Sequence, residues 1–257
     1  MNKSVKKSFL AAVSLIALSM GTQAFANSEV KLKKIDWQFD GVFGTVDKVS
    51  AQRGYQVYKE VCAACHSMNR IAFRNLTELG FSPAEVKSLA ASYKVKDGPN
   101  DSGDMFERDG LPSDYFVAPF PNEQAAGAGF NGKAPPDLSL IIKARHDGAN
   151  YVYSLLTGYG QTPPEHYAPI EGTHYNPYFP GGNILMPAPL SDGQVGYADG
   201  TKASVDQMSK DVVTFLQWAA EPEMESRKEM GIKVLIYLAI FTGFMYVAKR
   251  NLWKKLH

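Results

Sequence analysis

The sequence of 257 residues predicts a mainly α-helical fold with long loops rich in proline and glycine, and one C-terminal transmembrane helix. Three observations predict it. Apolar residues recur at helical spacing in several segments, proline and glycine are dense across residues 97–200, and a long apolar run lies near the C-terminus. Alternating strand patterns of useful length and internal repeats are absent from the sequence.

Four helices are expected in the body of the chain, over residues 51–64, 82–92, 149–157 and 204–220. The first places Gly54, Val57, Tyr58, Val61 and Cys65 on one face. The second begins with a Ser82 cap, a first-turn proline and an acid, as helix starts commonly do.

The fourth expected helix opens with a capping box formed by Ser204 and Gln207. An apolar stripe follows along it, made by Val205, Met208, Val212, Phe215, Leu216 and Ala219. Long ordered loops on so few helices usually surround something that supplies the missing core.

Residues 1–26 have the pattern of a secretory signal peptide. Three lysines precede a short apolar run, and Ala24-Phe25-Ala26 provides a cleavage signature. An uncleaved N-terminal anchor is the alternative. The pattern predicts a mature chain that starts near Asn27, outside the cytoplasm.

The apolar run at residues 231–248 is the better membrane span. Its 18 residues would cover roughly 27 Å as a helix, close to the thickness of a hydrocarbon core. The basic tail at residues 249–257 predicts that this end stays cytoplasmic. Residues 27–230 would then form a domain on the periplasmic side. A buried helix of a soluble protein is the alternative.

Charge and cysteine content exclude several classes. Residues 27–230 carry a net charge of −7, which argues against a basic nucleic-acid-binding body. The chain has only two cysteines, Cys62 and Cys65. A disulfide-stapled scaffold is therefore excluded, and so is a zinc or iron–sulfur site built from four cysteines.

Both cysteines lie in a C-x-x-C-H motif that ends in His66. This spacing is the signal for haem c attachment: each thiol forms one thioether, and the histidine becomes the proximal iron ligand. One alternative is a redox-active cysteine pair, which usually follows a strand in a βαβ unit. Another is half a zinc site, completed by histidines elsewhere: His146, His166 or His174.

The sixth iron ligand must come from another part of the chain. Most of the nine methionines lie in the signal peptide, near or in the membrane span, in the apolar stripe, or too close to His66. Met105 and Met186 remain, and Met105 belongs to a polar acidic loop. Met186 precedes Pro187 and Pro189, which would stiffen its loop. Met186 is therefore favoured, with an ordinary core methionine or a histidine ligand as alternatives.

With these motifs in place, the chain resembles the cytochrome c1 family, the haem subunit of the cytochrome bc1 complex. The matching segments run in order through most of the mature chain: RGYQVY (53–58), CAACHS (62–67), PPDLS (135–139), KARH (143–146), YVYSLLTGY (151–159), YNPYFP (175–180), MP (186–187), DVVTFL (211–216) and WAAEP (218–222). The resemblance implies a c-type cytochrome fold, with long loops around one covalently bound haem c.

The resemblance also assigns roles to positions of this sequence. It places the haem thiols on Cys62 and Cys65, the iron ligands on His66 and Met186, the propionate-binding arginine on Arg145, a haem-contacting tyrosine on Tyr151 and a proline beside the ring on Pro136. Some bacterial relatives carry an additional cysteine pair that braces the methionine region. This chain has none, so packing and proline are expected to stiffen it.

What the resemblance implies is an electron relay. The Rieske iron–sulfur protein would deliver one electron to the haem, and a soluble or tethered cytochrome c would remove it. The chain would not be an enzyme by itself. It would be a redox subunit, together with cytochrome b, of a dimeric respiratory or photosynthetic complex in the bacterial inner membrane. The rivals are another membrane-anchored c-type cytochrome and a haem enzyme or sensor with an open iron position.

An acidic segment at residues 97–114 contains six carboxylates and one arginine. It could steer a basic cytochrome c toward the haem, and added salt would then slow electron transfer. The other interpretation is an ordinary solvated loop.

Overall fold

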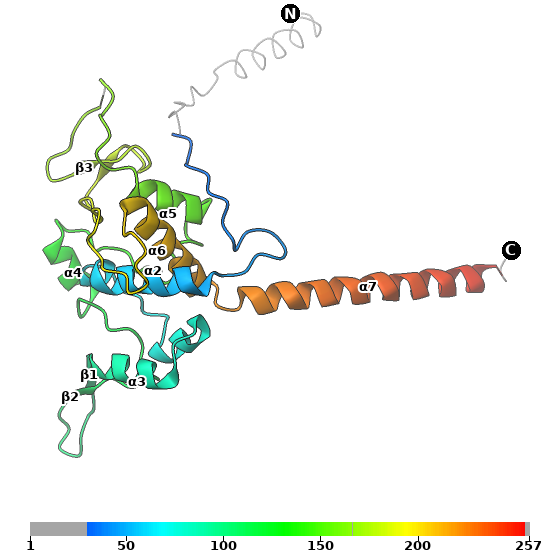
Figure 1. The fold of residues 1–257 in the computed structure, drawn as a ribbon. Coiled ribbons are helices and arrows are strands. Elements are labelled where there is room, and N and C mark those ends of the chain that lie inside the picture. The colour runs from blue at the N-terminus through cyan, green and yellow to red at the C-terminus, as the bar shows by residue number, and fades with distance from the viewer. Residues whose placement is uncertain (1–29, 166, 255–257) are drawn as a thin grey trace, which may run out of the picture. The chain divides into compact units, whose positions relative to one another are not determined.

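The computed structural model describes residues 30–165 and 167–254. The predicted signal peptide and His166 therefore lie outside the described residues. The fold is mainly helical, as predicted (Figure 1). In chain order the elements are α2 (Lys48–Glu60), the 3-10 helices η1 (Cys62–Ala64) and η2 (Phe73–Leu79), α3 (Pro83–Ala91), β1 (Lys94–Asp97), β2 (Phe106–Asp109), α4 (Glu123–Gly129), α5 (Gly148–Leu156), β3 (His174–Tyr175), β4 (Asn183–Ile184), α6 (Val205–Ala220) and α7 (Met224–Trp253).

The centre of the fold is the crossing of α2 and α6. The predicted stripe of α6 faces inward, with Met208, Val212 and Phe215 almost fully buried. Gly54 of α2 permits the close approach, because a Cβ there would lie 2.0 Å from the carbonyl oxygen of Asp211. The helix pair thus forms a tightly packed base for the segments that leave it.

A buried carboxylate joins the same two helices. Asp211 of α6 has no exposed surface, and its oxygens accept hydrogen bonds from Ser50 Oγ at 2.7 Å and Gln207 Nε2 at 3.1 Å. Arg53 of α2 adds a two-pronged contact, with Nε at 3.0 Å and a terminal nitrogen at 2.9 Å. The charge is thus both paired and hydrogen-bonded, as a buried carboxylate requires.

The helix ends differ in part from the sequence expectation. The first helix begins three residues earlier than predicted, because Asp47 Oδ1 accepts hydrogen bonds from the backbone of Val49 and Ser50. At α3 the Ser82–Glu85 capping box is complete. At α6 only half of the predicted box forms, since Ser204 Oγ accepts from Gln207 N while the Gln207 side chain donates to Asp211.

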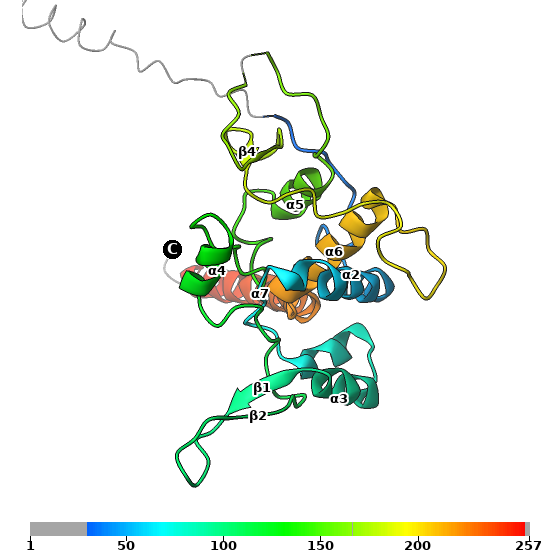
Figure 2. The same cartoon turned by 90° about the vertical axis from the view of Figure 1, so that its left-hand side faces the viewer.

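Two short antiparallel hairpins, β1–β2 and β3–β4, are strands that the sequence analysis did not predict. Their strands span four and two residues, too short for an alternating pattern to be recognised. The two hairpins lie on opposite sides of the α2–α6 pair (Figure 1, Figure 2).

The acidic segment 97–114 forms much of the β1–β2 hairpin and is partly neutralised there. Arg108 pairs with Asp97 and, through two nitrogens, with Asp114. Lys94 pairs with Asp109 at 2.5 Å. Three of the six carboxylates are therefore paired within the hairpin, and the unpaired charge is smaller than the sequence implied.

Helix α7 is 30 residues long and extends the predicted span at both ends. Its most apolar 18-residue window has a mean hydropathy of 1.8, which makes the helix long and apolar enough to cross a membrane. Apolar side chains are exposed all round it, including Leu235, Phe244 and Met245. A helix with this surface needs an apolar environment.

Candidate functional site

The C-x-x-C-H motif begins directly after α2, where the chain tightens into η1. The Cys65 and His66 amides donate hydrogen bonds to the Cys62 carbonyl, at 3.1 and 2.9 Å. Cys62 and its neighbours pack against the core, and both cysteines are free and partly buried. The helix crossing therefore fixes the backbone of the motif, and the two sulfur atoms remain available for bonding.

The electrostatics of Cys62 are not those of a redox-active thiol. Burial, with a smaller contribution from Cys65, raises the pKa of Cys62 to about 12. Catalytic cysteines of C-x-x-C redox motifs have a lowered pKa, because the thiolate is the reacting form. The raised pKa of Cys62 gives the redox-pair alternative no support.

His66 is oriented by a contact from a distant loop. Its Nδ1 lies 2.8 Å from the carbonyl oxygen of Pro136 and donates to it, so the Nε2 atom carries the lone pair. Burial lowers the pKa of His66 and favours the neutral imidazole. A neutral imidazole with one nitrogen held by a carbonyl is the arrangement found for histidine metal ligands.

Asp137 holds the Pro136 loop against the segment after His66. One carboxylate oxygen accepts from Ser67 Oγ and from the Asn69 amide, both at 2.8 Å. The other accepts from the Ser139 amide at 2.9 Å. These contacts lower the pKa of Asp137 against the opposing effect of burial. Asp137 thereby keeps the Pro136 carbonyl in place opposite the imidazole.

A second group of site residues surrounds Met186, which is partly buried in the loop after β4. The Tyr159 hydroxyl donates to the Met186 carbonyl at 2.9 Å. Burial and the neighbouring Tyr151 raise the pKa of Tyr159, so the hydroxyl stays a donor.

Asn183 of β4 organises the loop that precedes Met186. Its side-chain oxygen accepts from Tyr167 Oη at 2.6 Å, from the Ile170 amide at 3.0 Å and from Thr173 Oγ1 at 2.9 Å. Its nitrogen donates to two backbone carbonyls. Hydrogen bonds therefore hold this loop in addition to the packing and proline expected from the sequence.

Burial distinguishes Met186 from the other described methionines. Met68, Met208 and Met224 have 3% or less of their surface exposed, within the protein core. Met105 is 64% exposed, immediately before strand β2. The remaining two, Met230 and Met245, lie on α7.

Arg145 and Tyr151 lie near the start of α5. Arg145 is exposed; its guanidinium donates to the Ala144 carbonyl and pairs with no acidic side chain in the described part of the chain. It is therefore available to an external carboxylate. Tyr151 is partly buried and packs against the core.

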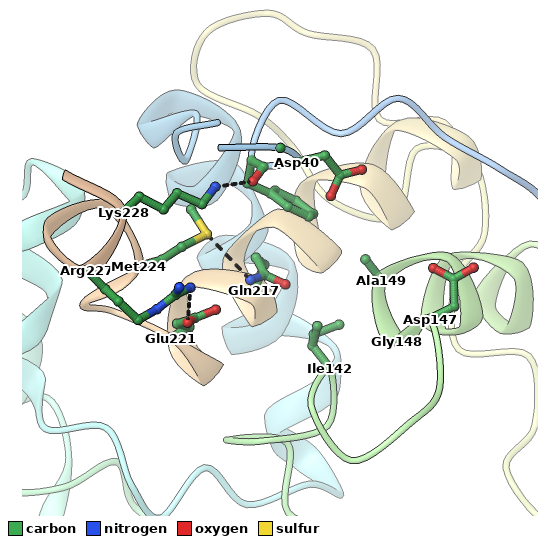
Figure 3. Close-up of a pocket in the computed structure, with 12 residues that line it drawn as sticks. Asp40, Ile142, Asp147, Gly148, Ala149, Gln217, Glu221, Met224, Arg227 and Lys228 are labelled. Atoms are coloured by element: carbon green, nitrogen blue, oxygen red, sulfur yellow. Dashed lines mark hydrogen bonds and ion pairs between the residues drawn. The ribbon is translucent and has the colours of Figure 1, made fainter. Parts of the chain in front are cut away.

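Two pockets of the structure lie away from these residues. One of about 300 Å³ is bounded by the loop at Asp40, the start of α5 and the α6–α7 junction (Figure 3). Another, of about 210 Å³, lies beside Trp37 and Arg53. Neither includes a predicted site residue. Among the residues that the structure describes, no three His, Cys, Asp or Glu side chains gather as a metal site, which gives the zinc alternative no support.

The structure thus brings six of the seven predicted site residues together in two groups, and no described contact joins Arg145 to either. Cys62, Cys65, His66 and Pro136 form one, and Tyr151 and Met186 belong to the other, joined by Tyr159. Two free thiols, a neutral imidazole with a free Nε2 and a thioether are the donor set that haem c takes, so the residues present fit that group.

The sequence analysis did not assign roles to Asp137, Tyr159 or Asn183. Asp137 and Tyr159 lay within the segments that carried the resemblance. The signal that could have identified them is their position in the sequence, because each is a polar residue in a segment that also contains a predicted site residue.

Residues 37–256 match the Cytochrome C1 family. "Cytochrome c1" of Rhodospirillum rubrum is 45% identical to this chain, over 97% of each. "Cytochrome c1, heme protein, mitochondrial" of Saccharomyces cerevisiae is 49% identical, over 84% of this chain and 70% of the yeast protein. "Cytochrome b/c1" of Bradyrhizobium diazoefficiens is 52% identical over 86% of this chain, which spans only 35% of that longer relative. The chain belongs to the cytochrome c1 family.

Proposed function

We propose that this chain is the haem-carrying, electron-transfer subunit of a cytochrome bc1 complex. In this role it accepts one electron from a Rieske iron–sulfur protein and passes it to a cytochrome c. The observation that carries the proposal is the C-x-x-C-H motif at the end of α2, with the His66 imidazole oriented by the Pro136 carbonyl. The family match across residues 37–256 favours this role over other membrane-anchored c-type cytochromes and haem enzymes.

The chain's own residues bind and orient the cofactor. Cys62 and Cys65 would hold it through two thioethers, His66 Nε2 and the Met186 sulfur would bind its iron, Arg145 would pair with a propionate, and Pro136 and Tyr151 would contact the ring. When bound, haem c supplies a one-electron couple at its iron. The methionine ligand favours a high potential, which suits an acceptor of electrons from quinol oxidation.

Cytochrome b is the first expected partner. The Bradyrhizobium relative is named "Cytochrome b/c1", and this chain matches about a third of it. A Candida albicans relative, 49% identical, is named "Cytochrome b-c1 complex catalytic subunit, mitochondrial". A name that joins both proteins on one polypeptide supports their assembly side by side. The complex is proposed to be dimeric and to include the Rieske protein.

Helix α7 supplies the membrane anchor in this proposal. Its apolar surface is exposed on all sides, and the basic residues at its end favour the cytoplasmic face. Residues 27–230 then form the periplasmic haem domain, residues 231–248 the span and residues 249–257 the cytoplasmic tail, after removal of residues 1–26. The membrane is the inner membrane of a bacterium.

The β1–β2 hairpin is a candidate surface for steering the acceptor. Asp101, Asp104 and Glu107 are exposed and lie outside the ion pairs of Arg108 and Lys94. Their neutralisation should reduce the rate of electron transfer to a basic cytochrome c and flatten its dependence on salt. If the variant Asp101→Asn, Asp104→Asn, Glu107→Gln transfers electrons with the same salt dependence as the wild type, the hairpin does not steer the acceptor.

Purification in mild detergent tests the complex assignment. We expect cytochrome b, with its b-type haem, and an iron–sulfur protein to accompany this chain. Acidified acetone should leave its haem attached, because thioethers resist that extraction. Colourless peptide with two free thiols would contradict haem attachment. A haem-bearing chain recovered alone would contradict only the complex.

Met186→Leu tests the sixth ligand. The variant should lose the sulfur-to-iron charge-transfer band and bind carbon monoxide when reduced. Its potential should fall by a sizeable part of the about 0.8 V range that axial ligands span. Met105→Leu is the matched control and should change none of these properties. A Met186→Leu protein that keeps the band would refute the assignment.

A further inference from the structure

A small loop before α2 exposes two large apolar side chains. Phe43 is 85% exposed and Val42 63%, and both lie between Gly41 and Gly44. Gly41 has a φ of +73°, a left-handed conformation that permits the tight turn. The loop closes on itself through Thr45 N to Gln38 O at 3.1 Å. The turn therefore holds Val42 and Phe43 outward, away from the protein core.

The loop is fastened to the start of α7. Lys228 Nζ donates to the carbonyls of Phe39 at 2.7 Å and Gly44 at 2.9 Å, the two ends of the loop. Glu225 Oε1 accepts from the Val46 amide at 2.8 Å. Figure 3 shows Lys228 reaching across to this loop, and Figure 1 shows the blue loop beside the first turns of α7. The apolar tip is thus fixed relative to the helix.

Its height along α7 matches the expected membrane surface. Lys228 precedes the apolar residues 231–248 by three residues, or about 4.5 Å of helix. Interfacial segments bury their apolar side about 5–10 Å deep, at the boundary between headgroups and acyl chains. A side chain that extends from a loop at the level of Lys228 can reach that boundary.

We propose that Val42 and Phe43 insert into the membrane interface beside α7 and give the haem domain a second contact with lipid. The inference rests on the proposed membrane span of α7. The occupant is lipid because Lys228, which holds both ends of the loop, lies three residues before the apolar segment of α7, whose side chains are exposed. Two adjacent side chains also present far less area than a stable protein interface buries.

The second contact has a consequence for the haem domain. A single helix allows tilt and rotation of whatever it anchors, and interfacial aromatic residues restrict both. Phe43, fixed to α7 through Lys228, resists rotation of the domain about the membrane entry point. The loop therefore helps to keep the haem domain at one orientation above the bilayer.

Site-directed spin labelling tests the proposal on the full haem-loaded chain. Cys62 and Cys65 are consumed by haem attachment in that protein, so Phe43→Cys provides the only reactive thiol. The label is placed in vesicles of phosphatidylcholine and phosphatidylglycerol, and its collisions with oxygen and with a water-soluble nickel chelate are measured. Met105→Cys, immediately before β2, is the aqueous control, and Met245→Cys on α7 is the lipid control.

We expect the label at position 43 to collide with oxygen several-fold more, relative to nickel, than the label at position 105. If it matches position 105 while position 245 reports lipid, the lipid contact is wrong and the anchor stands. Shielding from both reagents would mean coverage by protein and would also overturn the proposal. Nickel access at position 245 would refute the span of α7, and with it this inference.

Discussion

The two axial ligands of the proposed site are held by different kinds of structure. His66 follows the short helix η1 that extends α2, and a carboxylate joined to three donors fixes the loop behind it. Met186 lies in a loop whose position depends on Tyr159 and on the turns organised by Asn183. Specific contacts hold both residues. Packed helices position the backbone before His66, whereas individual hydrogen bonds position the loop of Met186.

This difference indicates which ligand gives way first. Breaking a helix crossing requires loss of buried surface and of a buried ion pair, whereas a loop moves when single hydrogen bonds are lost. We therefore expect damage to α2 or α6 to unfold the domain. Damage near Met186 should instead open the iron site within a folded protein.

Removal of Asp211 should have the largest effect. Asp211→Ala leaves the largely buried Arg53 with only the exposed Asp199 as its partner and removes the acceptor of Ser50 and Gln207, so the free energy of unfolding should fall by about 3 kcal/mol. Urea denaturation of the haem-loaded chain in detergent measures it. Lys210→Ala, on the same helix, removes only an exposed pair with Asp206 and should cost less than about 0.5 kcal/mol. Equal losses of stability in the two variants would contradict the view that the α2–α6 crossing holds the domain together.

The next effect tests the brace behind His66. Asp137→Asn removes the charge shared by Ser67, Asn69 and Ser139 and should cost about 2 kcal/mol of stability. The midpoint potential should also shift, because the Pro136 carbonyl then holds the imidazole less firmly. Glu85→Gln, an exposed cap at α3, is the control and should leave the potential unchanged. A shift in stability alone would limit Asp137 to a structural role.

A smaller loss should loosen the Met186 side alone. Tyr159→Phe removes one hydrogen bond to the Met186 carbonyl and should cost about 1 kcal/mol. Carbon monoxide should then bind the reduced protein faster than in the wild type, since the ligand leaves more often. Tyr115→Phe, at an exposed position, is the matched control. Unchanged binding rates in both variants would show that Tyr159 does not restrain the ligand.

The smallest effect is expected in the β1–β2 hairpin, away from both His66 and Met186. Arg108, with the Leu111 amide, lowers the pKa of Asp114 to about 2. A lowered carboxyl pKa stabilises the folded hairpin above about pH 4, and this contribution disappears as the pH falls toward 2. In Arg108→Gln the Asp114 pKa should move back up, as a carboxyl NMR titration would show. The haem spectrum of this variant should be unchanged. A changed spectrum would show that the hairpin influences the proposed haem site.

The local parts of the site were predictable from sequence. C-x-x-C-H is a motif of five adjacent residues, and the distances that matter within it are set by the backbone itself. The Ser82 cap with its first-turn proline and acid at α3 and the apolar stripe of α6 are likewise short-range patterns, and the structure confirms both. The length and apolarity of α7 could also be counted directly.

Contacts between distant segments could not be predicted in the same way. Asp137 meets Asn69 across 68 residues, and Tyr159 meets Met186 across 27. The predicted contact from the Gln207 side chain back to the Ser204 backbone does not form, because the Gln207 amide donates to the buried carboxylate of Asp211 instead. The pairing of the hairpin carboxylates by Arg108 depended on strands too short to recognise.

The sequence by itself determined the attachment chemistry, the principal helices and the apolar C-terminal segment, because each depends on residues a few positions apart. The tertiary structure decided which carbonyl orients His66, which methionines are buried in the core and where the Phe43 loop is fastened. Those outcomes depend on how chain segments pack against one another, and no spacing along the chain encodes that packing directly.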